Sequence, residues 1–201
     1  HLDSPPEQVE TTWATFDKVR ERWAGRIELQ AVALYGPDLM LEPERFRRVA
    51  ERTKASNGLL GGAIRVFEHS RQAMFNAVEL AGHLGIDIDM HCDETLETEA
   101  SALRDLVDAV IETGFAGKAL AGHCCVLTLQ DEPVARATID RVAEAGVAIV
   151  SLPMCNMYLQ DRHNEAFVRT PRFRGATLVN EFKAAGVTVA LASDNTRDPF
   201  Y

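Results

Sequence analysis

Four polar side chains stand where apolar segments of the sequence end, and their types suit hydrolytic chemistry. His91 and Glu94 lie three residues apart after an alternating segment. His123 and Asp194 each close a further apolar segment. Imidazole and carboxylate groups bind Zn²⁺ or Fe²⁺, and such a metal lowers the pKa of a bound water. A nearby carboxylate can carry the released proton to a substrate. This set of residue types is typical of metal-assisted hydrolysis.

Each of these residues taken alone has an ordinary explanation. A lone histidine at the end of a strand is more often a structural hydrogen-bond partner, and the acidic residues after His91 could form a solvated loop. The repetition of the pattern favours the functional interpretation, because His91, His123 and Asp194 occupy equivalent places in separate units. A buried carboxylate such as Asp194 is also costly unless it is paired or bound to a metal.

Short apolar segments alternate with amphipathic helical patterns along the whole chain. Patterns of helical period cover residues 9–24 and 134–145, and Gly85, Gly146 and Gly186 close helices before the next strand. The alternation indicates a parallel sheet covered by helices. Strands are predicted at residues 26–33, 58–64, 86–91, 118–123, 147–152 and 187–193, with a stub at residues 1–3.

The distribution of polar strand ends separates two α/β architectures. A doubly wound sheet collects its site at one switch point and usually carries a glycine-rich phosphate loop, and neither GxGxxG nor a P-loop is present. A (β/α)8 barrel gathers the carboxyl ends of all its strands around one cavity. Polar residues at strand ends throughout the chain therefore predict a TIM-type barrel.

Composition excludes several classes of protein. The formal net charge of -9 and the lack of a concentrated basic patch argue against nucleic acid as a partner. No apolar run approaches the length of a membrane span, and no signal peptide is evident, so we expect a cytoplasmic protein. The four cysteines show no CxxC spacing and suit buried, reduced thiols.

Five segments in order resemble the bacterial cytosine deaminases of the amidohydrolase superfamily. They are DMHCDE, AGHCC, LPMCNMYLQDR, RGATLVNEFKAAGV and ASDNTRDPFY. The resemblance runs from His1 to Tyr201 and is strongest after residue 86. It implies a metal-dependent (β/α)8 barrel present from about the second to the eighth strand. We expect residues 1–201 to form one partial barrel domain, without the first strand and the flanking small β domain.

The resemblance assigns roles to residues of this chain. His91 would bind the metal, and Asp194 would bind it and accept the proton of the water. Glu94 would carry a proton to a ring nitrogen of the substrate, and His123 would orient the hydroxide and help to activate the substrate. The residues implied to contact the substrate are Gly36, Asn156, Gln160, Asn195 and Phe200.

The sequence also departs from the family pattern. The HxH ligands of the first strand are not in this segment, and His1 resembles the histidine of the second strand, for which we expect a supporting role. Gly36 stands where cytosine deaminases carry a glutamine, and Asn195 stands where they carry a second aspartate. Because a site discriminates strongly through such polar contacts, cytosine itself is in question, and 5-methylcytosine, isocytosine and creatinine stay open.

The predicted function is hydrolytic deamination of an exocyclic amine on a small heterocycle. We expect the protein to use one divalent metal ion, Zn²⁺ or Fe²⁺, and to act on a small-molecule substrate. We expect no membrane partner, and a homo-oligomer is one of the oligomeric states left open. One alternative is a cyclic amide hydrolase like dihydroorotase or hydantoinase, but residues 58–64 lack the lysine that such enzymes use. The other is a non-catalytic barrel that binds a ligand, for which Glu94 would be unnecessary.

Overall fold

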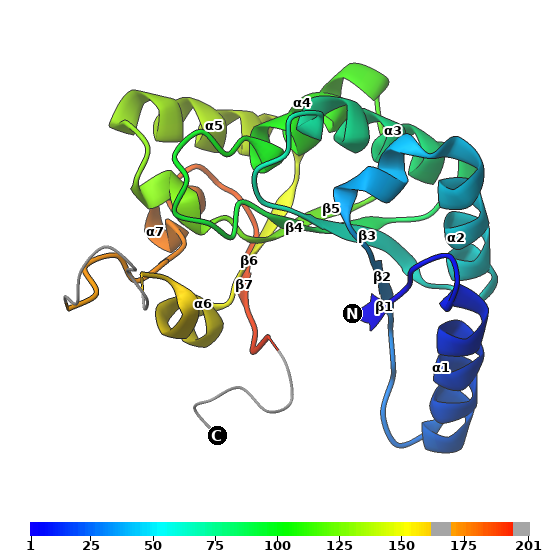
Figure 1. Ribbon diagram of the computed structural model, residues 1–201. Coiled ribbons are helices and arrows are strands. Elements are labelled where there is room, and N and C mark those ends of the chain that lie inside the picture. The colour runs from blue at the N-terminus through cyan, green and yellow to red at the C-terminus, as the bar shows by residue number, and fades with distance from the viewer. Residues whose placement is uncertain (162–169, 195–201) are drawn as a thin grey trace.

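The computed structural model describes residues 1–161 and 170–194. Within them, seven parallel strands form one sheet in which each strand pairs with the next along the chain (Figure 1). The strands are β1 (Leu2–Asp3), β2 (Val32–Leu34), β3 (Leu59–Ile64), β4 (Ile88–Cys92), β5 (Ala119–His123), β6 (Ala148–Ser151) and β7 (Val189–Leu191). This sequential order is that of successive units in a barrel and lacks the reversal of a doubly wound sheet.

Helices connect the strands, as the alternation of the sequence predicts. They are α1 (Val9–Trp23), α2 (Pro43–Ala55), α3 (Ser70–Leu84), α4 (Ala102–Thr113), α5 (Glu132–Ala145), α6 (Pro153–Leu159) and α7 (Val179–Ala184). Single 3₁₀ turns follow β2 at Pro37–Leu41 and β5 at Cys125–Thr128. Gly85 and Gly146 adopt the left-handed conformation directly after α3 and α5, which confirms their predicted place at the helix ends.

One predicted strand is much shorter than expected. The segment 26–33 forms a strand only from Val32, and its charged first part is exposed. Only Ala33 and Leu34 find register partners in β1, which is two residues long. On the other side, the register with β3 begins at Val32, opposite Leu59, so residues 26–31 precede the first register partners in both neighbouring strands. The other predicted strands agree with the structure to within two residues at each end.

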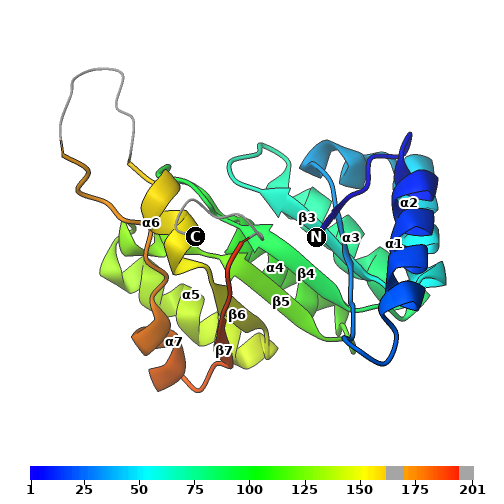
Figure 2. The ribbon, with the colours of Figure 1, turned by 90° about the horizontal axis from the view of Figure 1, so that it is seen from below.

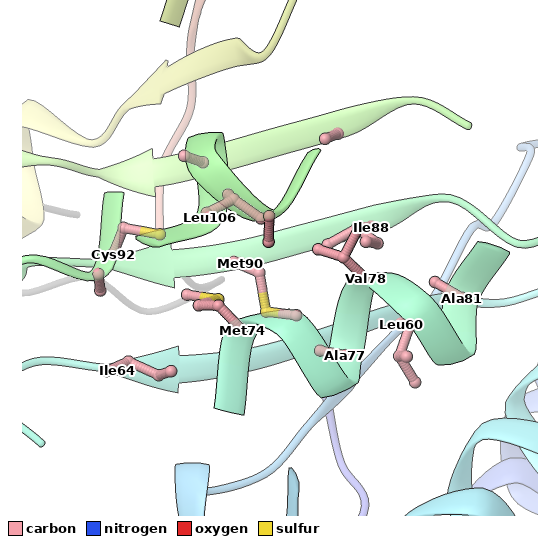
Figure 3. Close-up of a cluster of buried hydrophobic side chains, with 14 of the residues drawn as sticks. Leu60, Ile64, Met74, Ala77, Val78, Ala81, Ile88, Met90, Cys92 and Leu106 are labelled. Carbon is pink, nitrogen blue, oxygen red and sulfur yellow. The ribbon is translucent and has the colours of Figure 1, made fainter. Parts of the chain in front are cut away.

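The hydrophobic core lies between the sheet and helices α3 and α4 (Figure 3). One face of α3 packs on β3 and β4 because its small and flexible side chains recur at helical spacing. Met74, Ala77, Val78 and Ala81 of this face are all fully buried. They meet Ile88, Met90 and Cys92, which alternate along β4 on the side that faces the helices. The four cysteines are buried and unbridged, as predicted.

The opposite side of β4 and β5 carries the residues that alternate along each strand with those facing the helices. In Figure 2 these two strands lie in front of α4, so that this side faces the viewer. Asp89, His91 and Leu120 point to it and are only partly buried. None of the helices in the described ranges is long and apolar enough to cross a membrane.

A charged network joins three of the helices that cover the sheet. Asp108 of α4 accepts hydrogen bonds from Arg71 of α3 at 3.0 Å and from Arg141 of α5 at 2.6 Å. Burial raises the pKa of Asp108, but the two guanidinium groups outweigh it and hold the pKa below its ordinary value. The carboxylate thus links α3, α4 and α5 on their outer surface.

We expect the Asp108→Asn substitution to lower the free energy of unfolding at neutral pH by less than about 1 kcal/mol, because the pairs are partly exposed. The folded-state pKa lies below the unfolded one, so the contribution is present above pH 4 and is lost as the pH falls through the folded-state pKa. Urea unfolding from pH 7 to pH 2.5 would measure this. Glu132→Gln, in an exposed pair within α5, is the control. A wild-type advantage that is constant with pH would contradict the assignment.

Gly61 in β3 has no room for a side chain. A Cβ there would lie 2.5 Å from the carbonyl oxygen of Ala33 and 2.8 Å from that of Asp89, in the backbones of the two neighbouring strands. Gly61→Ala should therefore destabilise the protein by about 1–3 kcal/mol, as overpacking does. Gly122 of β5 is the matched control, because its Cβ would meet nothing closer than 3.7 Å. Equal thermal shifts for the two alanine variants would show that the strand spacing is not the constraint.

Candidate active site

The parallel register of β4 and β5 brings two histidines together in an unusual way. His91 is paired with Gly122, and Cys92 is paired with His123. Regular alternation would turn His123 to the side of Cys92, which faces the helices. Instead His123 has a φ of +67°, and its ring lies edge-on to that of His91 with 4.8 Å between the centroids. The break in strand conformation therefore moves His123 to the side that carries His91.

This turn at the end of β5 is held by neighbouring groups. Cys124 also has a positive φ, +47°, and its N–H donates to the carbonyl of Cys92 at 2.9 Å. The hydroxyl of Thr177 donates to the carbonyl of His123 at 2.6 Å. Left-handed conformations of residues other than glycine cost on the order of 1–3 kcal/mol and persist only where surrounding contacts enforce them. Such strain is commonly found at functional sites.

The side chain of His1 lies against that of His91, although the sequence predicts only a supporting role for His1. The two Nε2 atoms are 3.2 Å apart, and Asp89 Oδ2 is 3.6 Å from His1 Nε2. Burial, with the neighbouring rings of His123 and His1, lowers the pKa of His91 to about 4. His91 is therefore neutral near neutral pH, which is the form that binds metals. Two bare nitrogen lone pairs at this distance repel one another, so a proton or a cation must lie between them.

Glu94 has its carboxylate between groups from three other elements. Its side chain is 11% exposed, and Oε2 accepts a hydrogen bond from Arg65 at 3.1 Å. Oε1 lies 3.7 Å from His123 Nδ1 and 3.9 Å from Cys155 Sγ. Oε1 of Glu94 thus faces His123, while Oε2 is bound by the guanidinium of Arg65.

Asp93 fixes the loop that carries Glu94. Its buried carboxylate accepts hydrogen bonds from the N–H groups of Ala102 and Leu103, the first residues of α4, at 2.8 and 3.0 Å. Burial raises the pKa of Asp93 to about 6, although these two hydrogen bonds act in the opposite direction. Ser101, which precedes α4, makes no capping bond with its side chain. A residue eight positions earlier therefore caps this helix.

Asp194 is linked to the same cluster through sulfur. Cys155, in α6, has its Sγ 3.0 Å from Asp194 Oδ2 as well as close to Glu94. The charge of Asp194 acts to raise the pKa of His91, although burial outweighs it. Cys155 thereby lies between the two carboxylates that the sequence assigns to the site.

The predicted substrate residues are placed unequally. Asn156 is fully buried, with Oδ1 2.8 Å from His123 Nδ1. Gln160 is buried at the end of α6, next to Gly175. Gly36 is exposed after β2, where it helps to line a cleft of about 510 Å³. Asn195 and Phe200 lie outside the described residues.

The donor groups fit part of a metal site. Two imidazole nitrogens bound tetrahedrally at 2.0–2.1 Å from Zn²⁺ would be about 3.3 Å apart, close to the spacing of the Nε2 atoms of His1 and His91. Asp194 supplies a carboxylate whose charge acts on His91. Among the residues that the structure describes, however, no group of three or more His, Cys, Asp or Glu is arranged to hold a metal ion. These residues would therefore contribute part of a coordination shell.

Sequence reasoning overlooked two residues that contact Glu94. Arg65 follows β3 directly, so its position at a strand end was a usable signal. Cys155 gave no comparable signal, because its contact with Glu94 joins residues 61 positions apart. The roles assigned to His91, Glu94 and Asp194 stay predictions, and the structure supplies their arrangement.

Residues 17–201 match the amidohydrolase family. The chain belongs to this family. Amidohydrolase membership agrees with the parallel sheet and with the polar residues at the carboxyl ends of its strands.

Three relatives illustrate the similarity. A pterin deaminase from Rhizobium rhizogenes is 49% identical over 201 residues, which are 100% of this chain and 45% of that protein. The structure of 5-methylcytosine deaminase from Klebsiella pneumoniae has a TM-score of 0.81 at 24% identity, covering 99% of this chain and 48% of the other. N-isopropylammelide isopropylaminohydrolase from Burkholderia multivorans has a TM-score of 0.70 at 22% identity, covering 99% and 47%.

These comparisons establish the fold class. The chain spans about half the length of these relatives. The seven-stranded parallel sheet with its helices is part of the (β/α)8 barrel of the amidohydrolases, as the sequence predicts.

Asp93→Ala should lower the free energy of unfolding by about 1–3 kcal/mol, because two N–H groups at the start of α4 lose a buried acceptor. The control is Ser101→Ala, which stands at the expected capping position but leaves both bonds in place and should cost less. Denaturant unfolding of both variants measures the difference. If Ser101→Ala proves the more destabilising, Asp93 is not the cap.

Proposed function

We propose that the protein is a metal-dependent hydrolytic deaminase that replaces an exocyclic amine on a small heterocycle with oxygen. The observation that carries the proposal is the placement of Glu94. A largely buried carboxylate lies 3.7 Å from His123 Nδ1, on the loop that directly follows β4, the strand that carries His91. Binding of a ligand alone would not require a proton-transfer group beside two histidines.

The residues divide the reaction between them. His91, with Asp194, would hold a divalent metal, which when bound lowers the pKa of water and makes hydroxide available near neutral pH. Water adds to the carbon that carries the amine, and Glu94 transfers a proton from that water to the adjacent ring nitrogen. Asp194 accepts the remaining proton of the added hydroxyl and passes it to the amine, so that the carbon–amine bond breaks, ammonia leaves, and a carbonyl forms. Arg65 holds one carboxylate oxygen of Glu94, so that the other is left to exchange the proton.

The preferred substrate in this proposal contains a 2-amino-4-oxopyrimidine ring, as pterin and isocytosine do. The 49% identical relative is named for pterin, whose amine is on such a ring. Gly36 replaces a side chain with open space, because nothing lies within 4 Å of where its Cβ would be. A cleft lies beside it at the ends of β1 and β2, although none of His91, Glu94 and His123 lines this cleft.

A cyclic amide hydrolase is the less favoured reaction. The dinuclear members of that class use a carboxylated lysine from the strand equivalent to β3. This strand reads LLGGAI and has no lysine. The single-metal deaminase is therefore the proposal that the chain supports.

Ammonia release tests the proposal. The full-length protein, loaded with Zn²⁺ or Fe²⁺ and assayed for metal content, would be offered pterin, isocytosine, cytosine, 5-methylcytosine, creatinine and guanine. We expect release to be fastest with pterin, isocytosine and guanine, which contain a 2-amino-4-oxopyrimidine ring. Glu94→Gln should retain metal and lose about 100-fold or more in kcat, whereas Glu99→Gln, exposed in the same loop, should stay close to wild type. Metal-loaded protein that releases no ammonia from any of these compounds is not a deaminase of this class.

A further inference from the structure

The side chains of His123 and Asn156 form a buried pair beneath the proposed site. His123 is 1% exposed and Asn156 is 0% exposed. The imidazole Nδ1 and the amide Oδ1 are 2.8 Å apart. Asn156 lies in α6. The backbone N–H of Asn156 donates a hydrogen bond to the carbonyl of Leu152, which directly follows β6. The pair therefore joins the ends of two neighbouring strands.

The surroundings of Nδ1 decide which ring nitrogen carries the proton. A neutral imidazole has one N–H and one lone pair. Two oxygens approach Nδ1, Asn156 Oδ1 at 2.8 Å and Glu94 Oε1 at 3.7 Å. A lone pair on Nδ1 would face both oxygens in a buried space, which is repulsive. Turning the amide of Asn156 around would remove only the nearer oxygen, and the carboxylate would still face the lone pair. A hydrogen on Nδ1 satisfies both contacts.

We infer that Asn156 is a positioning residue that holds His123 as its Nδ1–H tautomer and leaves Nε2 as a bare hydrogen-bond acceptor. Glu94 cannot do this alone, because 3.7 Å exceeds hydrogen-bond distance. Nε2 of His123 and Nδ2 of Asn156 are both buried without a hydrogen-bond partner in the described part of the chain. Buried polar atoms of this kind are rare in folded proteins and point to a missing partner such as water or substrate.

The tautomer narrows the role of His123, an inference that rests on the proposed function. The resemblance to cytosine deaminases implies two roles, orienting the attacking oxygen and activating the substrate. A neutral ring with a bare Nε2 accepts a hydrogen bond from the attacking water or from the departing amine. It has no hydrogen to donate to a substrate acceptor from that nitrogen. Asn156 thereby assigns His123 to the water and the leaving group.

Nitrogen NMR of the imidazole tests the inference directly. The full-length, zinc-loaded protein would be labelled with ¹⁵N-histidine, and the His123 signals assigned from their loss in His123→Gln. We expect a pyrrole-type signal from Nδ1 and a pyridine-type signal from Nε2. The opposite pattern in the wild type overturns the inference, and this measurement requires no variant at Asn156.

Two substitutions separate positioning from packing. Asn156→Asp keeps an acceptor oxygen and should keep the Nδ1–H pattern, whereas Asn156→Leu should shift the ring toward the Nε2–H tautomer. Loss of an orienting partner of this type should lower kcat of the leucine variant by about 10–100-fold, with a smaller change in KM. Asn76→Leu, in α3, is the control that should leave the His123 signals unchanged. A folded, metal-loaded Asn156→Leu protein with the wild-type pattern contradicts the inference.

The outcomes also separate this inference from the proposed function. An Nδ1–H pattern in a protein that deaminates nothing would remove the function and keep the tautomer assignment. Deamination by a protein whose His123 carries its hydrogen on Nε2 would keep the function and remove the role of Asn156.

Discussion

The register between β4 and β5 is the constraint on which the arrangement of the site depends. Pairing Cys92 with His123 fixes how far the two strands run past each other. His91 then lies within β4, whereas His123 is the last residue of β5, where the regular strand conformation ends. Gly122 is the register partner of His91 in this arrangement. A shift of one residue would exchange the two sides of the strand and separate the rings.

Backbone strain and buried hydrogen bonds act together around this register. Asp93 and His123, at the ends of neighbouring strands, both have positive φ. Each is held by contacts outside its own strand, Asp93 by the N–H groups of α4 and His123 by Thr177 and Asn156. The loop carrying Glu94 is therefore anchored by α4, and the histidine that Glu94 faces is anchored by Thr177 and Asn156. Such second contacts keep functional side chains in one geometry.

Sequence patterns predicted the parts of this structure that follow from local alternation. The strands around residues 58–64, 86–91 and 118–123 were predicted because apolar period and glycine positions mark them directly. The segment 26–33 was predicted too long, since its register partners in β1 and β3 begin only at Ala33 and Val32, which no local pattern reveals. The position of His123 was predicted from its place at a strand end, but alternation alone would have turned its ring to the side of the sheet that faces the helices.

The contacts of the site were less predictable than its members. Arg65 and Cys155 reach Glu94 across 29 and 61 positions, so their proximity depends on how several units stack. The closeness of His1 and His91 depends on the curvature of the sheet between β1 and β4, which composition does not encode. Side-chain alternation assigns a residue to a side of the sheet, whereas the chemistry depends on separations of a few ångströms.

The sequential pairing of strands has a consequence for how the chain folds. Each strand joins the next along the chain through one helix-containing segment, so most of the sheet can form by successive local loop closures. His1 and Asp194, which flank His91, come from opposite ends of the sheet. Their approach has to wait until every intervening unit is in place. Intermediates that lack either end would contain much of the core and still be unable to bring these groups together.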